Sequence, residues 1–262
     1  MPVDASGDRY LTLLMQVLTD YVNISVHDGS EFVRPEYAGL DLNDLAVRRA
    51  IRAEGGDWPQ RAYSMSGLKR LANMRYCIEA VVADGVPGDV VETGVWRGGA
   101  CIFSKAVLDV LGAQDRWVWL ADSFQGLPPP DFERYPGEFA ADLSTIDYLK
   151  AGRRVVEENF RRFGLLDGRV RFIEGWFRDT LPTAPVRSIA VLRLDGDLYE
   201  STIVALDSLY DRVPPGGFIV IDDFGAVPAC ADAVRDFRQR RGITDPIVEI
   251  DWTGVYWRKG SA

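Results

Sequence analysis

Residues 89–101 read D-V-V-E-T-G-V-W-R-G-G-A-C. The apolar run at 89–93 predicts a strand, the glycines predict a turn, and the apolar pattern over 100–111 predicts a helix. Missing side chains in such a turn let a ligand approach the backbone, although a tight turn without a ligand would look the same. The spacing G-x-x-x-G-G differs from the G-x-G-x-x-G of dinucleotide sites. The stretch therefore predicts a strand–turn–helix unit of an α/β fold.

The same alternation continues along the chain. Strands are predicted at 117–121, 170–174, 189–194 and 218–221, and helices at 151–163, 201–210 and 229–241. Alternating strands and helices imply right-handed crossovers, so the sheet should be parallel and covered on both faces. The extended runs 247–250 and 254–258 flank D-W-T-G and predict an antiparallel hairpin. We therefore predict a Rossmann-like, doubly wound, mainly parallel seven-stranded sheet with a C-terminal antiparallel hairpin.

The first part of the chain has a different pattern. Apolar residues at helical spacing predict helices over 8–22 and 64–85, whereas the polar, glycine-interrupted segment 23–60 predicts a loop or lid. We therefore expect an N-terminal helical lid region over 1–85 and a core over 86–262. Residues 128–150 form a long insertion in that core, and a connection of this length is typical of a functional flap.

Composition excludes several classes of function. The chain has 262 residues, 47% of them hydrophobic, and a net charge of -9, which disfavours a nucleic-acid partner. Its three cysteines lack C-x-x-C spacing, so neither a zinc site nor a disulfide framework is expected. No signal peptide and no apolar run of about 20 residues is present, so we expect a cytoplasmic protein without a membrane partner. His27 is the only histidine and is predicted to be exposed, which leaves a carboxylate as the expected general base.

Paired acids follow two neighbouring predicted strands. Asp195 and Asp197 come after the apolar run 189–192, and Asp222 and Asp223 come after 218–221. Each acid alone could be a cap or part of a surface salt bridge. Several carboxylates converging beside an apolar core are costly unless a cation joins them. Carboxylates without nearby His or Cys favour a hard ion, Mg²⁺ first and then Ca²⁺ or Mn²⁺.

Three other strand ends suggest a nucleoside. Glu92 would repel a pyrophosphate but suits a ligand with a free amino group. Asp122 stands where an acid holds ribose hydroxyls in doubly wound folds, or it is a simple cap. Trp176 or Phe177, after Gly175, could cover an adenine ring or belong to the core. Together they indicate a nucleoside ligand that has no phosphate group for which the site must provide binding.

With these residues assembled, the chain resembles the class I S-adenosylmethionine-dependent methyltransferases, and within them the macrocin-type O-methyltransferases, which methylate sugar hydroxyls of macrolide, aminocoumarin and related antibiotics. The matching stretches are D-W-P at 57–59, V-P-G-D-V-V-E-T-G-V-W-R-G-G-A-C at 86–101, A-D-S-F-Q-G-L-P at 121–128, G-W-F-R-D-T-L-P at 175–182, L-R-L-D-G-D-L-Y-E-S-T at 192–202 and I-D-D-F at 221–224. The first 55 residues and the 128–150 insertion match poorly and would choose the acceptor.

The resemblance implies that S-adenosylmethionine is the cofactor. The implied cofactor-binding residues are Ser64, Met65, Ser66, Glu92, Thr93, Gly94, Val95, Trp96, Arg97, Gly98, Gly99, Ala100, Asp122, Ser123, Phe124, Gln125, Gly175, Trp176 and Phe177. It also implies a small-molecule glycoside acceptor and a homo-oligomer, either a dimer or a larger assembly. Trp58, Tyr63, Pro128–Pro130 and Tyr135 could line the acceptor pocket or pack the lid.

The resemblance further implies a divalent metal, usually Mg²⁺, held by Asp195, Asp222 and Asp223. Related catechol-type enzymes carry a lysine three positions after the first metal aspartate, but this chain has Leu198 there. We therefore expect Asp195 to serve both as metal ligand and as the base that deprotonates a metal-bound sugar hydroxyl. The role of Asp197, which either braces the loop or adds to the metal site, stays open.

Two alternatives are kept. A D-x-D followed by a later D-D also outlines haloacid-dehalogenase-type phosphatases, but Tyr199 replaces the expected Thr or Val and no lysine lies between 195 and Lys259. The fold could also serve as a non-catalytic scaffold that binds S-adenosylmethionine. The intact glycine turn and the four acids argue against this alternative.

Overall fold

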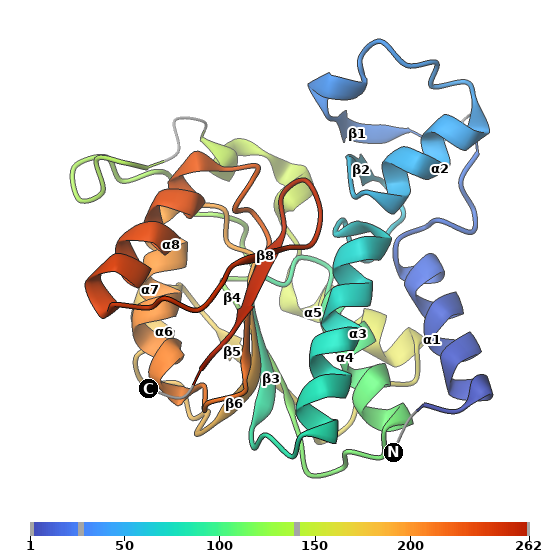
Figure 1. Cartoon of the computed structure of the whole chain (residues 1–262). Coiled ribbons are helices and arrows are strands. Elements are labelled where there is room, and N and C mark those ends of the chain that lie inside the picture. Colours follow the sequence, from blue (N-terminus) through green and yellow to red (C-terminus); the bar gives the residue numbers. More distant parts are fainter. Residues whose placement is uncertain (1–2, 26–28, 139–141, 261–262) are drawn as a thin grey trace.

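The computed structural model describes residues 3–25, 29–138 and 142–260, so His27 lies outside the described residues. One seven-stranded sheet forms the centre, with the strand order β5-β4-β3-β6-β7-β9-β8 (Figure 1). Its strands are β3 (Asp89–Thr93), β4 (Val118–Asp122), β5 (Val170–Glu174), β6 (Ile189–Leu194), β7 (Phe218–Ile221), β8 (Val248–Glu249) and β9 (Val255–Arg258). The first five pair in parallel, whereas β9 pairs antiparallel with β7 and β8. This confirms the predicted sheet and hairpin.

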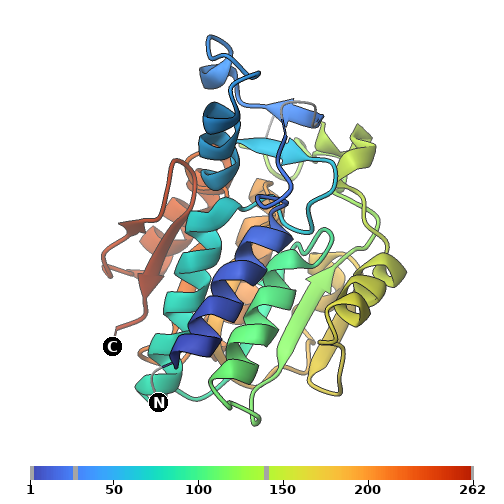
Figure 2. The same ribbon diagram turned by 90° about the vertical axis from the view of Figure 1, so that its right-hand side faces the viewer.

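Helices cover both faces of the sheet (Figures 1 and 2). One face carries α1 (Ala5–Leu18), α3 (Gly67–Ala83), α4 (Gly99–Val110) and α5 (Arg153–Arg162), and the other carries α6 (Phe177–Thr180), α7 (Tyr199–Leu209) and α8 (Pro228–Arg241). Because side chains alternate along a strand, Val90 joins the first core and Val91 the second. The sheet is therefore doubly wound, and its carboxyl ends form one common edge.

The predicted first helix is displaced. It was expected over 8–22 but spans Ala5–Leu18. Asp4 caps it, because its side chain accepts a hydrogen bond from the Gly7 amide at 2.7 Å, and Thr19 ends it. The short helix α6 was not predicted, since four residues carry too little periodicity.

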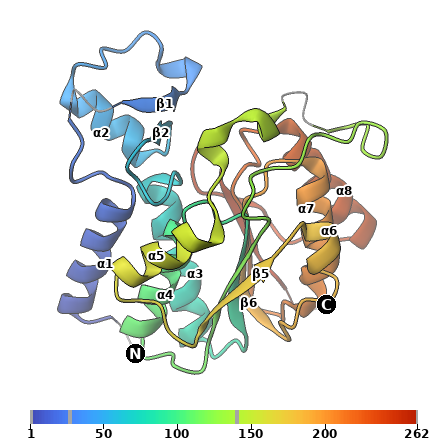
Figure 3. The ribbon, with the colours of Figure 1, turned by 180° about the vertical axis from the view of Figure 1, so that it is seen from behind.

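The segment 23–60, expected to be a loop or lid, contains regular structure. It forms a two-stranded sheet from β1 (Ser30–Val33) and β2 (Asp57–Pro59), and the helix α2 (Leu45–Ala53). A buried ion pair holds these parts together, with 2.8 Å between Arg52 Nη2 and Asp57 Oδ2. The segment lies at the same end of the molecule as the carboxyl ends of the parallel strands (Figures 1 and 3).

The described residues of the insertion 128–150 also lie at this end (Figure 3). Its described part contains the 3-10 turns η2 (Leu143–Thr145) and η3 (Asp147–Leu149), and residues 139–141 lie outside the described residues. Glu138 joins the insertion to α7, since its carboxylate accepts hydrogen bonds from the amides of Tyr199 (2.8 Å) and Glu200 (3.0 Å). Across the described ranges, no helix has the length and apolar character that a membrane span requires.

Candidate active site

Three predicted acids converge at the carboxyl edge of the sheet. Asp195 follows β6, and Asp222 and Asp223 follow β7, the neighbouring parallel strand. One oxygen from each carboxyl group lies within 4.8 Å of the others. We call these three residues the aspartate triad. Asp197 is not part of it, but its amide donates to Asp223 Oδ2 at 3.2 Å and so ties the two loops together.

Arg193 lies beneath the triad, and sequence reasoning missed it. Its side chain is 1% exposed, and its two Nη atoms contact four residues. Nη1 pairs with Glu92 and with Asp195, the latter at 2.8 Å. Nη2 donates to the Ser66 hydroxyl at 2.8 Å and pairs with Asp222. A charged residue inside the apolar run 189–194 was the available signal, because an arginine is fully buried only when it is paired.

Arg70, on α3, is the second buried arginine of the site. It pairs with the other carboxylate oxygen of Asp222 and, through Nε, with Asp251 Oδ2 at 3.0 Å. Burial alone would raise the pKa of Asp222, but the guanidinium groups of Arg193 and Arg70 lower it below its usual range. Asp222 is therefore held as an anion from two sides.

The pKa values of the other acids are shifted in the opposite direction. Burial raises the pKa of Asp195 to about 6, with Asp222 adding to the effect although Arg193 opposes it. Burial together with the charges of Asp195 and Asp222 raises the pKa of Asp197 to about 7. The pKa of Asp223 is raised well above its usual range by burial and by Asp197. Negative charge is therefore in excess here, even with two arginines present.

The triad fits a divalent cation. Its donors are carboxylate oxygens close enough to share one ion, which is the chemistry that Mg²⁺, Mn²⁺ and Ca²⁺ prefer. A divalent charge would also offset the repulsion that raises the pKa values of Asp195 and Asp223. The arginine pairs on Asp195 and Asp222 resemble the outer hydrogen bonds that orient ligating carboxylates in metal sites.

The glycine turn after β3 lies directly against the acid-bearing loop. Gly94 has φ +84°, and a Cβ atom there would lie 1.7 Å from the carbonyl oxygen of Asp195. Trp96 also has a positive φ of 45°, a strained conformation of the kind that gathers at functional sites. The turn is braced by Asp122, whose Oδ2 accepts from the Val95 amide at 2.7 Å and whose Oδ1 accepts from the Phe124 amide at 2.6 Å. Asp122 therefore acts as a cap here, and a contact to ribose stays a prediction.

Glu92, expected to meet a free amino group, is already paired. Besides Arg193, it contacts Cys101, whose thiol lies 2.7 Å from Oε2. Burial raises the pKa of Glu92 to about 7. It nevertheless lines a cavity together with Asp195, so a polar ligand group in that cavity would meet the Glu92–Arg193 pair.

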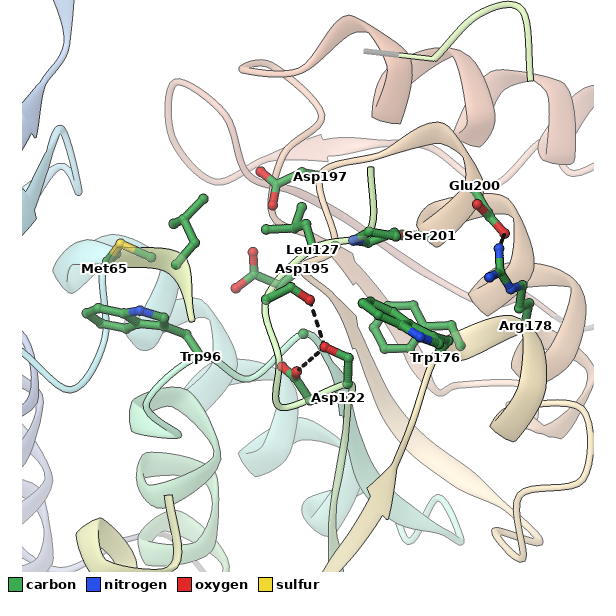
Figure 4. A pocket seen from close by; sticks show the side chains of 17 residues that line it. Met65, Trp96, Asp122, Leu127, Trp176, Arg178, Asp195, Asp197, Glu200 and Ser201 are labelled. Atoms are coloured by element: carbon green, nitrogen blue, oxygen red, sulfur yellow. Dashed lines mark hydrogen bonds and ion pairs between the residues drawn. The ribbon is translucent and has the colours of Figure 1, made fainter. Parts of the chain in front are cut away.

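A first cavity of about 810 Å³, including its open mouth, opens between the glycine turn and α6. Trp96 and Trp176 lie on opposite sides of it, with Asp122 and Asp195 between them (Figure 4). The predicted cofactor residues that line it are Met65, Gly94, Trp96, Asp122, Ser123, Trp176 and Phe177. Leu127, Pro128, Arg178 and Glu200 also line it and were not among the predicted cofactor residues.

A second, larger cavity of about 1930 Å³, including its open mouth, shares Asp195 and Asp197 with the first. The predicted cofactor residues that line it are Ser64, Met65, Ser66, Glu92, Val95, Trp96, Gly99 and Ala100, and all three triad residues line it as well. Asp195, Asp197, Met65, Trp96 and Leu149 border both cavities. Six predicted cofactor residues border neither cavity: Thr93, Arg97, Gly98, Phe124, Gln125 and Gly175.

Aromatic side chains from three segments of the chain pack together beside the larger cavity, which Trp58 and Trp96 line directly. Trp58 of β2 stacks on Tyr148 of the insertion, with ring centroids 5.5 Å apart and planes at 1°. Trp96 donates its indole N–H to the Tyr148 carbonyl at 2.8 Å. Of the residues predicted near the acceptor, Trp58 and Tyr63 line this cavity, whereas Tyr135 packs on Tyr199 and lines neither cavity.

Comparisons with known proteins give consistent matches. The chain matches the macrocin O-methyltransferase (TylF) family over residues 7–259. It is 48% identical over 271 residues to the 8-demethyl-8-(2,3-dimethoxy-alpha-L-rhamnosyl)-tetracenomycin-C 4'-O-methyltransferase of Streptomyces olivaceus, covering 97% of this chain and 94% of that protein. It is 45% identical to the mycinamicin III 3''-O-methyltransferase of Micromonospora griseorubida, covering 97% of each.

A solved structure agrees with this relationship. The O-methyltransferase NovP superposes with a TM-score of 0.87 at 44% identity, covering 97% of this chain and 100% of that one. The match spans the N-terminal region, the sheet and the hairpin. The chain therefore belongs to the macrocin O-methyltransferase family and is an O-methyltransferase.

Proposed function

We propose that the chain transfers a methyl group from S-adenosylmethionine to a sugar hydroxyl of a glycosylated natural product, in the biosynthesis of an antibiotic, with a divalent ion, Mg²⁺ first, at the aspartate triad. The single observation that carries the proposal is the convergence of Asp195, Asp222 and Asp223 in the larger cavity, with Asp195 also bordering the smaller one. The family relatives, which are named as methylating rhamnosyl-tetracenomycin and mycinamicin compounds, support the class of acceptor.

The two cavities suit two different ligands. The smaller one has the aromatic and acidic lining suited to a nucleoside, with Trp176, Phe177 and Asp122. The larger one has room for a bulky glycoside and is lined by Phe32, Trp58, Ile146 and Trp252. We assign the donor to the first cavity, to the glycine turn and to the adjoining part of the second cavity that Ser66 and Glu92 line, and the acceptor to the rest of the second cavity. The acids at the junction would then face the reacting hydroxyl.

The two bound groups supply the chemistry that side chains lack. S-adenosylmethionine supplies a methyl group on a positively charged sulfur, and the divalent ion acts as a Lewis acid that makes a sugar hydroxyl easier to deprotonate. The protein's own part is to hold the triad, to orient the two ligands and to accept the proton. No histidine or lysine of the described residues lines either cavity, so we assign the proton to an aspartate of the D-x-D pair.

Asp195 is the base predicted from sequence, and Asp197 is a competing candidate. Asp195 is a triad member and its Oδ2 pairs with Arg193, so a metal ion and the substrate proton would compete for its remaining lone pairs. Asp197 lines both cavities, stands outside the triad and, within the described residues, shows no ion pair. Its φ of 57° is strained, as is common for functional residues.

Paired variants decide between them. If Asp195 is both ligand and base, Asp195→Asn loses turnover and weakens Mn²⁺ binding, whereas Asp197→Asn keeps most of its kcat. If Asp197 is the base, Asp197→Asn loses kcat by about 10²–10⁴-fold, the usual contribution of a general base, with Mn²⁺ affinity little changed. Both variants should keep their affinity for S-adenosylhomocysteine. Near-normal kcat in both would reject an aspartate base.

Further parts of the proposal concern organisation. Residues 1–85 are proposed as the lid region and 86–262 as the methyltransferase core, with 128–150 shaping the acceptor cavity. Leu143, Ile146 and Leu149 of the insertion border that cavity, which supports this division.

A homo-oligomer, as expected from the resemblance, can be tested by light scattering. The phosphatase alternative can be tested with a generic aryl phosphate, on which we expect no turnover.

A further inference from the structure

Arg193 is the residue through which the glycine-turn side of the site and the aspartate triad meet. It is directly opposite Glu92 in the register of β3 and β6, so both side chains leave the same face of the sheet. Nη1 is shared between Glu92 and Asp195, while Nη2 is shared between Ser66 and Asp222. One planar group therefore orients residues from both predicted ligand sites.

The geometry of this arrangement adds something that charge alone does not supply. A buried carboxylate such as Asp222 can be neutralised by one partner, and Arg70 already pairs with it. The planar guanidinium group of Arg193 has N–H donors in fixed directions, and these orient Asp195 and Asp222 toward each other. The same group orients Glu92 toward the larger cavity. Only the guanidinium group has this geometry, because a lysine ammonium is a single point charge.

We propose that Arg193 is a positioning residue shared by the donor site and the metal site. It holds two triad carboxylates for the divalent ion and Glu92 for the polar end of the donor. The inference rests on the proposed function, since it assumes that both ligands bind. Arg70 provides a matched comparison, because it is also buried and also pairs with Asp222. Its other hydrogen bonds to described residues go to Asp251 and Gly55 and not to Glu92.

The test measures binding rather than turnover. Mn²⁺ affinity is measured by electron paramagnetic resonance and S-adenosylhomocysteine affinity by calorimetry, for the wild-type protein, Arg193→Lys and Arg70→Lys. Both variants keep the positive charge and lose the planar guanidinium group with its fixed donor directions. In Arg193→Lys we expect Mn²⁺ affinity to fall about 10–100-fold, the usual cost of losing an outer metal-site partner, and S-adenosylhomocysteine affinity to fall as well. In Arg70→Lys we expect only Mn²⁺ affinity to fall.

A purely structural role predicts something else: lower melting temperatures in both variants and unchanged Kd values in the folded fraction. If Arg193→Lys does not fold, Ser66→Ala decides, because it removes one anchor of Nη2 without changing any charge. We expect it to weaken Mn²⁺ binding several-fold although Ser66 is outside the triad, and an unchanged Mn²⁺ Kd would overturn the proposal.

The inference and the proposed function fail differently. Wild-type protein that binds S-adenosylhomocysteine but no Mn²⁺ would overturn the metal site and the role of Arg193 together. Wild-type protein that binds both, with an Arg193→Lys variant whose two Kd values are unchanged, would overturn the role of Arg193 and leave the proposed function standing. Loss of Mn²⁺ affinity alone in Arg193→Lys would also overturn the shared role.

Discussion

A Cβ atom at Gly94 would lie 1.7 Å from the carbonyl oxygen of Asp195. The glycine turn and the acid-bearing loop therefore touch through their backbones, since the Asp195 amide also donates to the Thr93 carbonyl at 2.8 Å. The position of the acids depends on the absence of a side chain on the neighbouring strand end. This contact suggests the first prediction.

Gly94→Ala should disrupt both ligand sites. The overlap is with backbone, which no rotamer change can relieve, and φ +84° is unfavourable for alanine. We expect the free energy of unfolding to fall by roughly 1–3 kcal/mol and turnover to be lost. Urea denaturation and a methyl-transfer assay measure this. Gly168→Ala is the control, because nothing lies within 4 Å of its Cβ position. Full activity of Gly94→Ala would contradict the described turn.

Removal of divalent metal should abolish turnover and spare donor binding. The triad collects excess negative charge that a cation offsets, whereas the aromatic lining of the smaller cavity does not depend on one. Dialysis against a chelator followed by calorimetry with S-adenosylhomocysteine and an activity assay would show this. Added Mg²⁺ or Mn²⁺ should restore activity. Undiminished turnover after exhaustive chelation would rule out the metal.

Glu138→Ala should destabilise the start of α7. Its carboxylate accepts from the amides of Tyr199 and Glu200, which α7 cannot satisfy internally because Leu198 is its N-cap. We expect a loss of about 0.5–2 kcal/mol in unfolding free energy and a lower kcat. Glu138→Gln should lose less. Asp142→Ala, which removes a cap only from the short turn η2, is the control. Equal stability of the Glu138 and Asp142 variants would argue against this cap.

The stability of metal-free protein should fall as pH rises from about 4 to about 7. An acid whose pKa is raised from 3.8 to about 7, as for Asp197, keeps its proton in the folded state after the unfolded chain has released it. Asp197→Asn lacks this effect, so its stability relative to wild type should grow through this window and level off above it. Denaturation at several pH values measures this, with Asp115→Asn as an exposed control. A constant difference would contradict the raised pKa.

Trp58→Ala should impair acceptor binding and leave donor binding intact. Trp58 lines only the larger cavity and stacks on Tyr148. Its removal deletes an apolar wall, so we expect the KM for the acceptor to rise about tenfold or more, as stacked aromatic contacts are worth about 0.5–1.5 kcal/mol beyond area burial. Trp117→Ala, at the amino end of the sheet, is the control. An unchanged acceptor KM would remove Trp58 from the acceptor site.

Much of the sheet was predictable because parallel strands leave clear patterns. The strands over 89–93, 170–174, 189–194 and 218–221 have the predicted bounds, and β4 differs by one residue at each end. Acids directly after such runs must gather at one edge, so the convergence of the acids could be predicted from two short motifs, the D-G-D at 195–197 and the D-D at 222–223. By contrast, β1 and β2 are too short for periodicity, and α2 lies between glycine-rich breaks that suggested a loop.

The buried arginines show a different limit of sequence reasoning. Arg193 interrupts an apolar run, so its presence is visible, but its partners come from residues 66, 92 and 222 and only the fold brings them together. Arg70 gave a weaker signal, because an arginine on a helix usually faces solvent. The structure was therefore needed to tell which acids are paired with an arginine and which are not.

The stack of Trp58 on Tyr148 has a consequence for engineering new regioselectivity. Tyr148 also donates its hydroxyl to the Pro59 carbonyl at 2.7 Å, so strand β2 and the insertion are joined by ring stacking and by a hydrogen bond. A chimera that grafts only one of these parts from a relative would leave half of this interlock without its counterpart. Productive domain shuffling would have to transplant both as one cassette.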